Sequence, residues 1–198
     1  RNALQREVMR DAVENVPANI EEKITRSDFA GLRKLLQDKK TAPMDMGSEK
    51  KVYINPANEQ RVIKRFDKPT GTEKRMTSES DIFIKDPTAE ASVFAALKDQ
   101  SRNPNTRTYK NIGGRDYQMQ DKVDILSETE NPISYARELE AELKRSGVRN
   151  DTIELENPSN IGLRDGKPVL IDAGGMSVPR LSPEARERYR KTVKALKK

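Results

Sequence analysis

The stretch NIGLRDGKPVLIDAGG, Asn160 to Gly175, carries the clearest structural pattern in the chain. It predicts a β-hairpin with one strand over 161–163 and a second over 169–171. The dipeptide Asp165–Gly166 between them is a favoured hairpin turn, because both residue types tolerate a positive φ. This stretch therefore predicts a two-stranded hairpin whose turn lies at Asp165–Gly166.

A polar residue stands at each open end of this hairpin, Asn160 before the first strand and Asp172 after the second. Both side chains offer oxygen atoms, which hard cations prefer as ligands. The glycines after Asp172 let the backbone turn away and leave the carboxylate at the edge. We favour a Mg²⁺ site that bridges phosphates. The alternative is that Asp172 caps the next turn and Asn160 merely begins the hairpin.

Composition restricts the possible chemistry. Of the 198 residues, 33% are hydrophobic and 35% are charged, so we expect a thin core in one compact domain or a small two-lobed one. The absence of Cys and His excludes disulfides, Cys-ligated zinc and a histidine base. Catalysis must use carboxylates, Lys or hydroxyls, and a metal must be bound by oxygen. No apolar run is long enough to span a membrane.

The net charge of +6 favours an anionic partner, which is a nucleotide, a nucleic acid or an acidic protein surface. Five Tyr, four Phe and no Trp give little capacity for base stacking, so nucleic acid ranks last. Because the chain begins with Arg1, we expect an excised domain or a processed product.

The apolar spacing predicts an alternation of helices and strands. A cap at Ser27–Asp28 is expected to separate two of the helices. The predicted helices cover 3–16, 20–24, 29–36, 87–97 with Asp86 as its cap, 134–146 and 183–196. The strands before the hairpin cover 51–55, 61–66, 108–112 and 116–120, and a loop covers 67–80.

Two further segments carry candidate chemistry. In GSEKKVY, Gly47 precedes a strand that leads through a turn to a strand bearing Lys64, an arrangement that can cover a triphosphate. Glu90 lies in the first turns of a helix, on the face of its apolar residues, and a buried carboxylate there needs a partner such as Lys64. The alternatives are a structural turn at Gly47, a solvent-facing Lys64 and a Glu90 that is favoured by the helix dipole.

In chain order, GSEKKVY, VIK, a helix with Glu90, NIGL and LIDAGG resemble the motifs of the protein-kinase-like fold over roughly residues 44–180. The pattern is similar to kinase-like domains of phage and mobile-element polyvalent proteins and to minimal bacterial effector kinases. The resemblance implies an α+β, two-lobed fold with ATP between the lobes. It divides the chain into a basic helical extension over 1–41, an N-lobe with its hinge over 42–123 and a reduced, mostly helical C-lobe over 124–198.

The resemblance also implies roles for single residues. Lys64 would hold the phosphates of ATP and pair with Glu90, while Asn160 and Asp172 would bind Mg²⁺ or Mn²⁺. Further nucleotide contacts are implied for Gly47, Ser48, Val52, Met119, Gln120 and Asp121, with the hinge over 119–123.

The catalytic loop departs from the family pattern, which places an Asp five residues before the metal-binding Asn. That position is Leu155, which cannot act as a base. We expect Asp151 to be the base, brought into place by an insertion. The alternatives are that Glu154 or Glu156 substitutes for it, or that the base is missing.

We therefore expect an ATP- and Mg²⁺-dependent phosphotransferase, a minimal atypical protein kinase that modifies a protein hydroxyl. The alternative is a pseudokinase or nucleotide-binding interaction module, which the short stretch after Gly175 favours. The expected partners are a nucleotide and a protein, without membrane or nucleic acid. The expected location is the cytoplasm, that of the host cell for a phage or effector protein.

Overall fold

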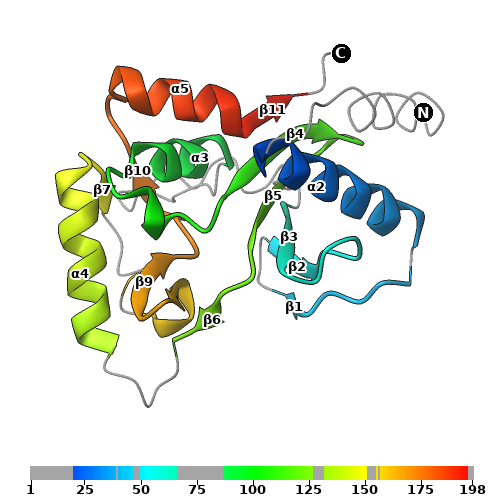
Figure 1. Cartoon of the computed structure of the whole chain (residues 1–198), viewed down its shortest axis with the longest axis horizontal. Coiled ribbons are helices and arrows are strands. Elements are labelled where there is room, and N and C mark those ends of the chain that lie inside the picture. Colours follow the sequence, from blue (N-terminus) through cyan, green and yellow to red (C-terminus); the bar gives the residue numbers. More distant parts are fainter. Residues whose placement is uncertain are drawn as a thin grey trace, which may run out of the picture. The chain divides into compact units, whose positions relative to one another are not determined.

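The computed structural model describes residues 20–38, 40–46, 50–66, 87–126, 132–150, 155 and 157–195. The chain divides into two compact units, one of Arg1–Lys68, Tyr109–Lys122 and Ala195–Lys198, the other of Pro69–Thr108 and Val123–Lys194. Both units combine helices and strands (Figure 1), so the predicted α+β class is confirmed. The predicted helix over 3–16 and loop over 67–80 lie outside the described residues. The division at 41/42 and 123/124 stays a prediction.

An antiparallel sheet forms the first unit. Its strands are β1 (Asp45–Met46), β2 (Lys50–Ile54), β3 (Arg61–Phe66), β4 (Arg107–Ile112) and β5 (Arg115–Asp121). The order of the whole sheet is β1-β2-β3-β5-β4-β11, with β11 at Val193–Ala195. The four strands predicted here are confirmed. The last helix was expected to reach residue 196, but it ends at Thr192 because the chain enters β11.

Helix α2 (Ile20–Gln37) packs its apolar stripe on one face of this sheet. Phe29 and Leu32 join a core cluster with Tyr53, Ile63 and Met119. The predicted break at Ser27–Asp28 is wrong, since the helix runs through both residues without interruption. The acidic side chain there serves a long-range contact and not a cap.

That contact is a buried ion pair between Asp28 of α2 and Arg61 of β3, which are 0% and 1% exposed. The Arg61 guanidinium reaches the Asp28 carboxylate at 2.6 and 2.9 Å and Asp121 Oδ1 of β5 at 2.7 Å. The Tyr109 hydroxyl donates to Asp28 Oδ2 at 2.9 Å. Burial acts to lower the pKa of Arg61, but the hydrogen bonds and charges of Asp28 and Asp121 outweigh it and raise that pKa.

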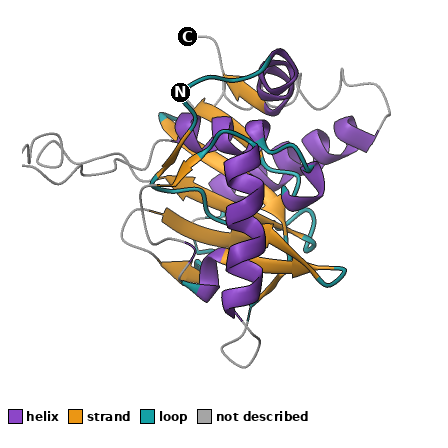
Figure 2. Cartoon of the chain, turned by 90° about the vertical axis from the view of Figure 1, so that its left-hand side faces the viewer, coloured by secondary structure: helices purple, strands orange, loops and turns teal. Residues whose placement is uncertain are grey.

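The second unit combines helices with short strands. Its helices are α3 (Pro87–Ala96), η1 (Gln100–Arg102), α4 (Pro132–Arg145), η3 (Pro158–Asn160) and α5 (Pro183–Thr192), and its strands are β6 (Asp124–Ile125), β7 (Arg149–Asn150), β8 (Ile161–Arg164), β9 (Lys167–Leu170) and β10 (Met176–Ser177). Helix α3 packs against α5 and β10, and α4 packs against β9 and β7. Figure 2 shows α4 as the long helix in front of the strands. One core cluster joins α3, α4 and the β8–β9 hairpin.

Glu142 of α4 is a buried acceptor in this unit, with a side chain only 1% exposed. Its carboxylate accepts from the Asp99 amide at 2.7 Å and from the Ser146 hydroxyl at 3.0 Å, and it pairs with Arg145. Burial acts to raise the pKa of Glu142, but these donors together outweigh it and lower the pKa. The charged form of Glu142 therefore stabilises the turn between α3 and η1.

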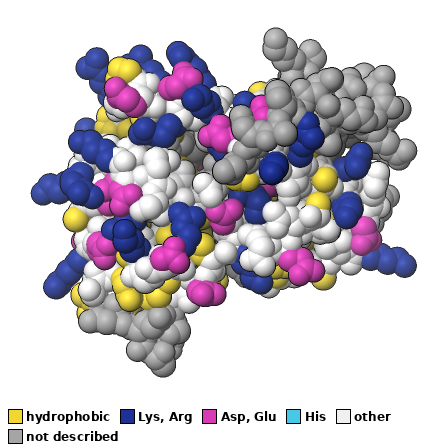
Figure 3. All heavy atoms as spheres, viewed as in Figure 1, with side chains coloured by type: hydrophobic (Ala, Val, Ile, Leu, Met, Phe, Trp, Pro, Cys, Tyr) yellow, Lys and Arg dark blue, Asp and Glu magenta, His cyan; other side chains and the backbone are white. Residues whose placement is uncertain are grey.

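The surface is heavily charged, as expected from the composition. Figure 3 shows lysine and arginine side chains spread over the visible face among acidic ones. Among the described residues, no helix combines the length and the apolar character needed to cross a membrane.

We predict that Asp28→Ala destabilises the protein by about 3–5 kcal/mol, because it leaves the Arg61 guanidinium buried beside a single carboxylate. Urea unfolding at neutral pH measures the loss. Glu187→Ala is the matched control, since the Glu187 carboxylate is 55% exposed and lies 3.6 Å and 3.9 Å from its partners Arg190 and Lys191. That variant should change the free energy of unfolding by less than about 0.5 kcal/mol. Equal effects of the two substitutions would contradict a structural role of the buried pair.

We predict a pH-dependent effect of Glu142→Gln. The lowered pKa means that the stabilisation by Glu142 is complete above its ordinary value of 4.5 and is lost as the pH falls through the lower folded-state value. The variant should be less stable by about 1–2 kcal/mol at pH 7, where the carboxylate makes charge-assisted hydrogen bonds. The difference in unfolding free energy should shrink in acid. A difference that stays constant from neutral pH into acid would refute this account.

Candidate functional site

The β8–β9 hairpin forms as the sequence predicts. Asp165 and Gly166 have φ values of 54° and 72°, which is the backbone of a two-residue hairpin turn. Ile161 pairs with Leu170 and Arg164 with Lys167. The hairpin therefore has a closed end at the turn and an open end at Asn160 and Asp172.

Asn160 and Asp172 both lie at the open end. The Asn160 carbonyl accepts a hydrogen bond from the Ile171 amide at 3.0 Å, which extends the ladder by one pair and fixes the residue next to Asp172. Asp172 Oδ1 accepts from the Gly174 amide at 2.8 Å, so this carboxylate also caps the following turn. Both sequence interpretations of Asp172 are therefore compatible, because capping uses one oxygen and orients the carboxylate.

The hairpin is anchored by apolar packing in the core of the second unit. Ile161, Leu170 and Ala173 are fully buried in the cluster that also contains Leu139 and Leu143 of α4. The polar residues at its open end are only half buried. The backbone at the site is thus fixed by apolar packing, while the side chains of Asn160 and Asp172 retain access to solvent.

Two arginines tie the hairpin to the segment around η1. Arg164 donates to the carbonyls of Ser101 and Asn103 at 2.6 and 3.1 Å. Arg102 donates to the Pro168 carbonyl at 3.1 Å and pairs with Glu138 of α4. These contacts keep the closed end of the hairpin in place.

In the first unit, strand register places Lys64 on the sheet face opposite α2. Val52, Lys64 and Gln118 form one row across β2, β3 and β5. The next row on that face is Ile54, Val62 and Gln120. Side chains alternate between the faces of a strand, so the residues between these rows, such as Ile63, point to the α2 core. Predicted site residues Val52, Lys64 and Gln120 therefore share one face.

Met119 and Asp121 lie on the other face of β5. Met119 is 0% exposed and belongs to the core beneath α2. The Asp121 carboxylate is bonded to Arg61. The Met119 side chain packs in the core and the Asp121 side chain binds Arg61. The nucleotide contacts predicted for these two residues are therefore limited to their backbone groups.

The other predicted site residues lie in the second unit or outside the described residues. Glu90 lies in α3 and is 2% exposed, and its pairing with Lys64 stays a prediction because the two residues belong to different units. Five predicted or alternative residues lie outside the described residues, namely Gly47, Ser48, Asp151, Glu154 and Glu156. Leu155 is 4% exposed within the core of the second unit, which agrees with its exclusion as a base.

Sequence reasoning missed Gln118. It is the direct neighbour of Lys64 across the sheet and is fully buried. The signal was available in the alternation of DYQMQD, where every second residue faces the same way, but the pairing of β3 with β5 was needed to bring Gln118 to Lys64.

The donor set at the hairpin fits a hard cation in a limited way. Asn160 and Asp172 offer an amide oxygen and a carboxylate, the ligand types that Mg²⁺ takes. Within the described ranges no cluster of three or more His, Cys, Asp or Glu side chains is arranged to hold a metal. A cation here would need phosphate and water oxygens to complete its shell, which is how Mg²⁺ is usually held with nucleotides.

Comparisons with known proteins add a distant similarity. No family model matches the chain, and no curated protein matches it. Among the solved structures that match is the complex of Rio2 kinase with ADP/Mg²⁺ and phosphoaspartate from Chaetomium thermophilum. The two chains are 15% identical with a TM-score of 0.41, over 96% of this chain and 67% of that one.

We predict that Gly162→Ala destabilises the second unit by about 1–3 kcal/mol, a typical cost of overpacking. A Cβ on Gly162 would lie 2.4 Å from Val123 Cγ2 and 3.1 Å from Ile171 Cδ1. Val123→Ala removes the nearer atom, so the double variant should be more stable than Gly162→Ala alone. Urea unfolding of both single variants and the double variant gives the coupling energy. Additive losses would show that the close approach to Val123 is not the cause.

Proposed function

We propose that this chain is an ATP- and Mg²⁺-dependent phosphotransferase of the protein-kinase-like type that modifies a protein hydroxyl. The observation that carries the proposal is the convergence of Asn160 and Asp172 at the open end of an anchored hairpin. Phosphoryl transfer requires mainly positioning and neutralisation of charge, so it suits a chain without His.

Asn160 and Asp172 would hold Mg²⁺ or Mn²⁺ in this proposal. The bound cation would supply neutralisation of the phosphate charge. The Asp172 carboxylate is oriented by the Gly174 amide, which lowers the entropy lost when it binds a ligand. The core packing under Ile161 and Leu170 keeps both ligand backbones fixed.

Lys64 would donate to phosphate oxygens from the sheet face that it shares with Val52 and Gln118. Glu90 would hold the Lys64 ammonium in place in the family arrangement. The apolar side chains of Val52, Ile54 and Val62 on this face suit the flat, weakly polar surface of a base. Backbone groups of Met119 to Asp121, with Gly47 and Ser48, would make the remaining nucleotide contacts.

Asp151 would accept the proton of the attacking hydroxyl, with Glu154 or Glu156 as substitutes. The hydroxyl oxygen forms a bond to the γ-phosphorus, the bond from that phosphorus to the bridging oxygen breaks, and ADP leaves. A general base contributes about 10²–10⁴-fold to such a rate. A chain with a displaced base would therefore bind the nucleotide and transfer phosphate slowly.

Leu155 favours a second candidate, a nucleotide-binding module without transfer activity. It occupies the position five residues before Asn160, and its side chain is buried in the core of the second unit. Under either candidate the partners are a nucleotide and a protein. We also propose that the chain is related to phage, mobile-element or effector proteins and that it acts in the cytoplasm.

We predict that Asp172→Asn abolishes the rise in melting temperature that ATP with Mg²⁺ causes, because it removes the charged ligand at the open end of the hairpin. Asp165→Asn makes the same change at the closed end, where the residue is exposed and Asn tolerates its positive φ. It should keep the full shift. If neither variant alters the shift, the cation is not bound at the hairpin.

Incubation with γ-labelled ATP then separates the two candidates. A phosphotransferase incorporates label into itself or a protein substrate, and Asp172→Asn should reduce the rate by about 10²–10³-fold, as expected for loss of a group that stabilises transferring charge. Binding without incorporation identifies the module without transfer activity. Incorporation that survives Asp172→Asn unchanged would overturn the kinase assignment.

A further inference from the structure

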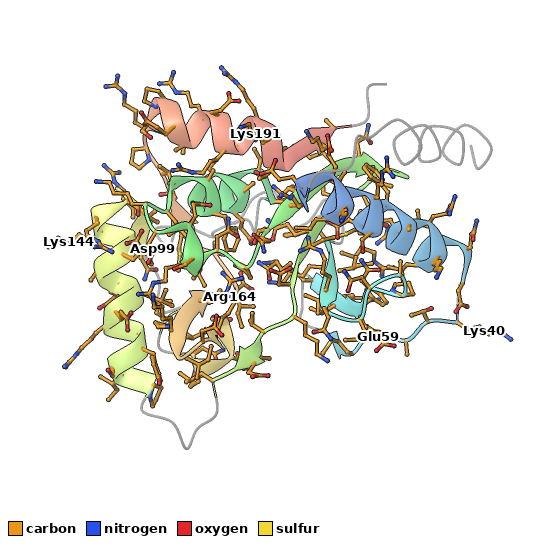
Figure 4. All side chains as sticks on the ribbon, viewed as in Figure 1. Lys40, Glu59, Asp99, Lys144, Arg164 and Lys191 are labelled. Atoms are coloured by element: carbon orange, nitrogen blue, oxygen red, sulfur yellow. The ribbon has the colours of Figure 1, made fainter. Side chains whose placement is uncertain are left out.

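A groove of about 430 Å³ runs along α4 in the second unit. Its floor contains Leu143 and Val148, which are 1% and 9% exposed. Its rim carries the exposed charged residues Arg137, Glu140 and Lys144 of α4. Figure 4 shows Lys144 extending outward from this helix. The groove is thus apolar at its base and charged at its edge.

The rim charges differ from the other charged residues of α4. Glu138 pairs with Arg102, and Glu142 pairs with Arg145. Within the part of the chain that the structure describes, the side chains of Arg137, Glu140 and Lys144 make no hydrogen bond or ion pair. The charges that α4 needs for its own packing are satisfied, and those along the groove are left available for a partner.

An exposed apolar side chain continues the same helical stripe. Ile133 is 62% exposed and lies one turn before Arg137. It is one of four large hydrophobic side chains that are exposed among the described residues. A partner that covers the groove would also remove this apolar surface from water, which is favourable.

We propose that the groove docks an acidic, extended segment of the protein substrate. Arg137 and Lys144 are two turns apart, about 10 Å along the helix axis. Two acidic residues three positions apart in a polyproline II segment lie on the same side of the chain, because that helix has three residues per turn, and they span about 9 Å. Glu140 lies between the two cations and disfavours an acid at the middle positions. The preferred pattern is acid-x-x-acid with neutral or basic residues between and an apolar residue beside it for Ile133.

This inference rests on the proposed function, because the groove is lined by a residue that directly precedes the proposed base in the chain. Asn150 lines the groove and ends β7, directly before the predicted base Asp151. Asn150 also pairs with Met176 of β10, which follows Asp172 closely in the chain. A segment held on α4 would therefore lie beside Asn150, the residue that precedes the proposed base in the chain, and Asn150 pairs with the strand that follows the proposed metal ligand.

The test is fluorescence anisotropy of a labelled peptide with the full chain, in the absence of nucleotide. The probe is a peptide of about twelve residues with two Asp three positions apart, neutral residues between them and flanking Leu. We expect it to bind about tenfold more tightly than the same peptide with Lys in place of Asp, with affinity that falls as salt is raised. A third Asp between the two acids should weaken binding. Equal binding of the acidic and basic peptides would overturn the proposal.

Variants of the rim give changes of opposite sign. Arg137→Glu and Lys144→Glu should each weaken the acidic peptide about fivefold, because attraction becomes repulsion at an exposed site. Glu140→Gln should strengthen it. Arg180→Glu is the matched control, since it makes the same charge reversal on an exposed residue of the same unit outside the groove, and it should change affinity less than twofold. The proposal fails if Arg180→Glu weakens binding as much as the rim variants do.

The measurement is independent of ATP turnover. If the chain fails the labelled-ATP test and still binds the acidic peptide at this rim, the docking surface is supported and the kinase assignment is wrong. Active phosphate transfer with no discrimination between the peptides removes the docking surface alone. Thermal unfolding of each variant, followed by circular dichroism, should be unchanged, because all the substituted side chains are exposed.

Discussion

The burial of one guanidinium between two carboxylates is the constraint on which the first unit depends. Arg61 is held by Asp28 from a helix and by Asp121 from a neighbouring strand. Removing any one of these charges from the group leaves another in a medium of low polarity, which is far more costly than exposing it to water. The helix, β3 and β5 must therefore associate in a single arrangement. That arrangement decides which sheet face is covered by α2 and which face carries Lys64.

The two faces of the sheet then differ in role. One face packs against α2, and the other carries Lys64, the proposed phosphate contact. Alternation along β3 sends Ile63 and Arg61 toward α2 and sends Lys64 the other way. Phe29 packs edge-to-face on Tyr109 with ring centroids 5.0 Å apart, which adds to the apolar packing under the helix. A shift of one residue in the register of β3 would bury Lys64 under α2 and leave Arg61 without its partners. The ion pair thus protects the register on which the proposed phosphate contact relies.

Local patterns in the sequence predicted local structure well. The hairpin was predictable because Asp165–Gly166 specifies a turn and the flanking apolar residues specify two strands. The location of Asn160 and Asp172 at the same end follows from that register. The role of Asp28 was not predictable, because its partner lies 33 residues away, and Asp121 lies 60 residues from Arg61. An acid after Ser27 resembles a helix cap in sequence, and only tertiary packing shows that it is an interior ion pair. Met119 and Gln118 are adjacent in the chain and face opposite ways, so the side chain that accompanies Lys64 depended on knowing which strand pairs with β3.

The interleaved course of the chain has a consequence for its synthesis on the ribosome. The first unit needs α2, the β2–β3 hairpin and the strand that ends at Asp121, while α3 and η1 of the other unit are made between them. Arg61 consequently emerges with one of its two counterions still untranslated. Native-like assembly of this unit must wait until β5 has left the exit tunnel, and until then β3 presents an unpaired edge of the kind that associates with other strands. The interval between the emergence of β3 and the emergence of β5 is therefore the one in which a nascent chain most needs a chaperone.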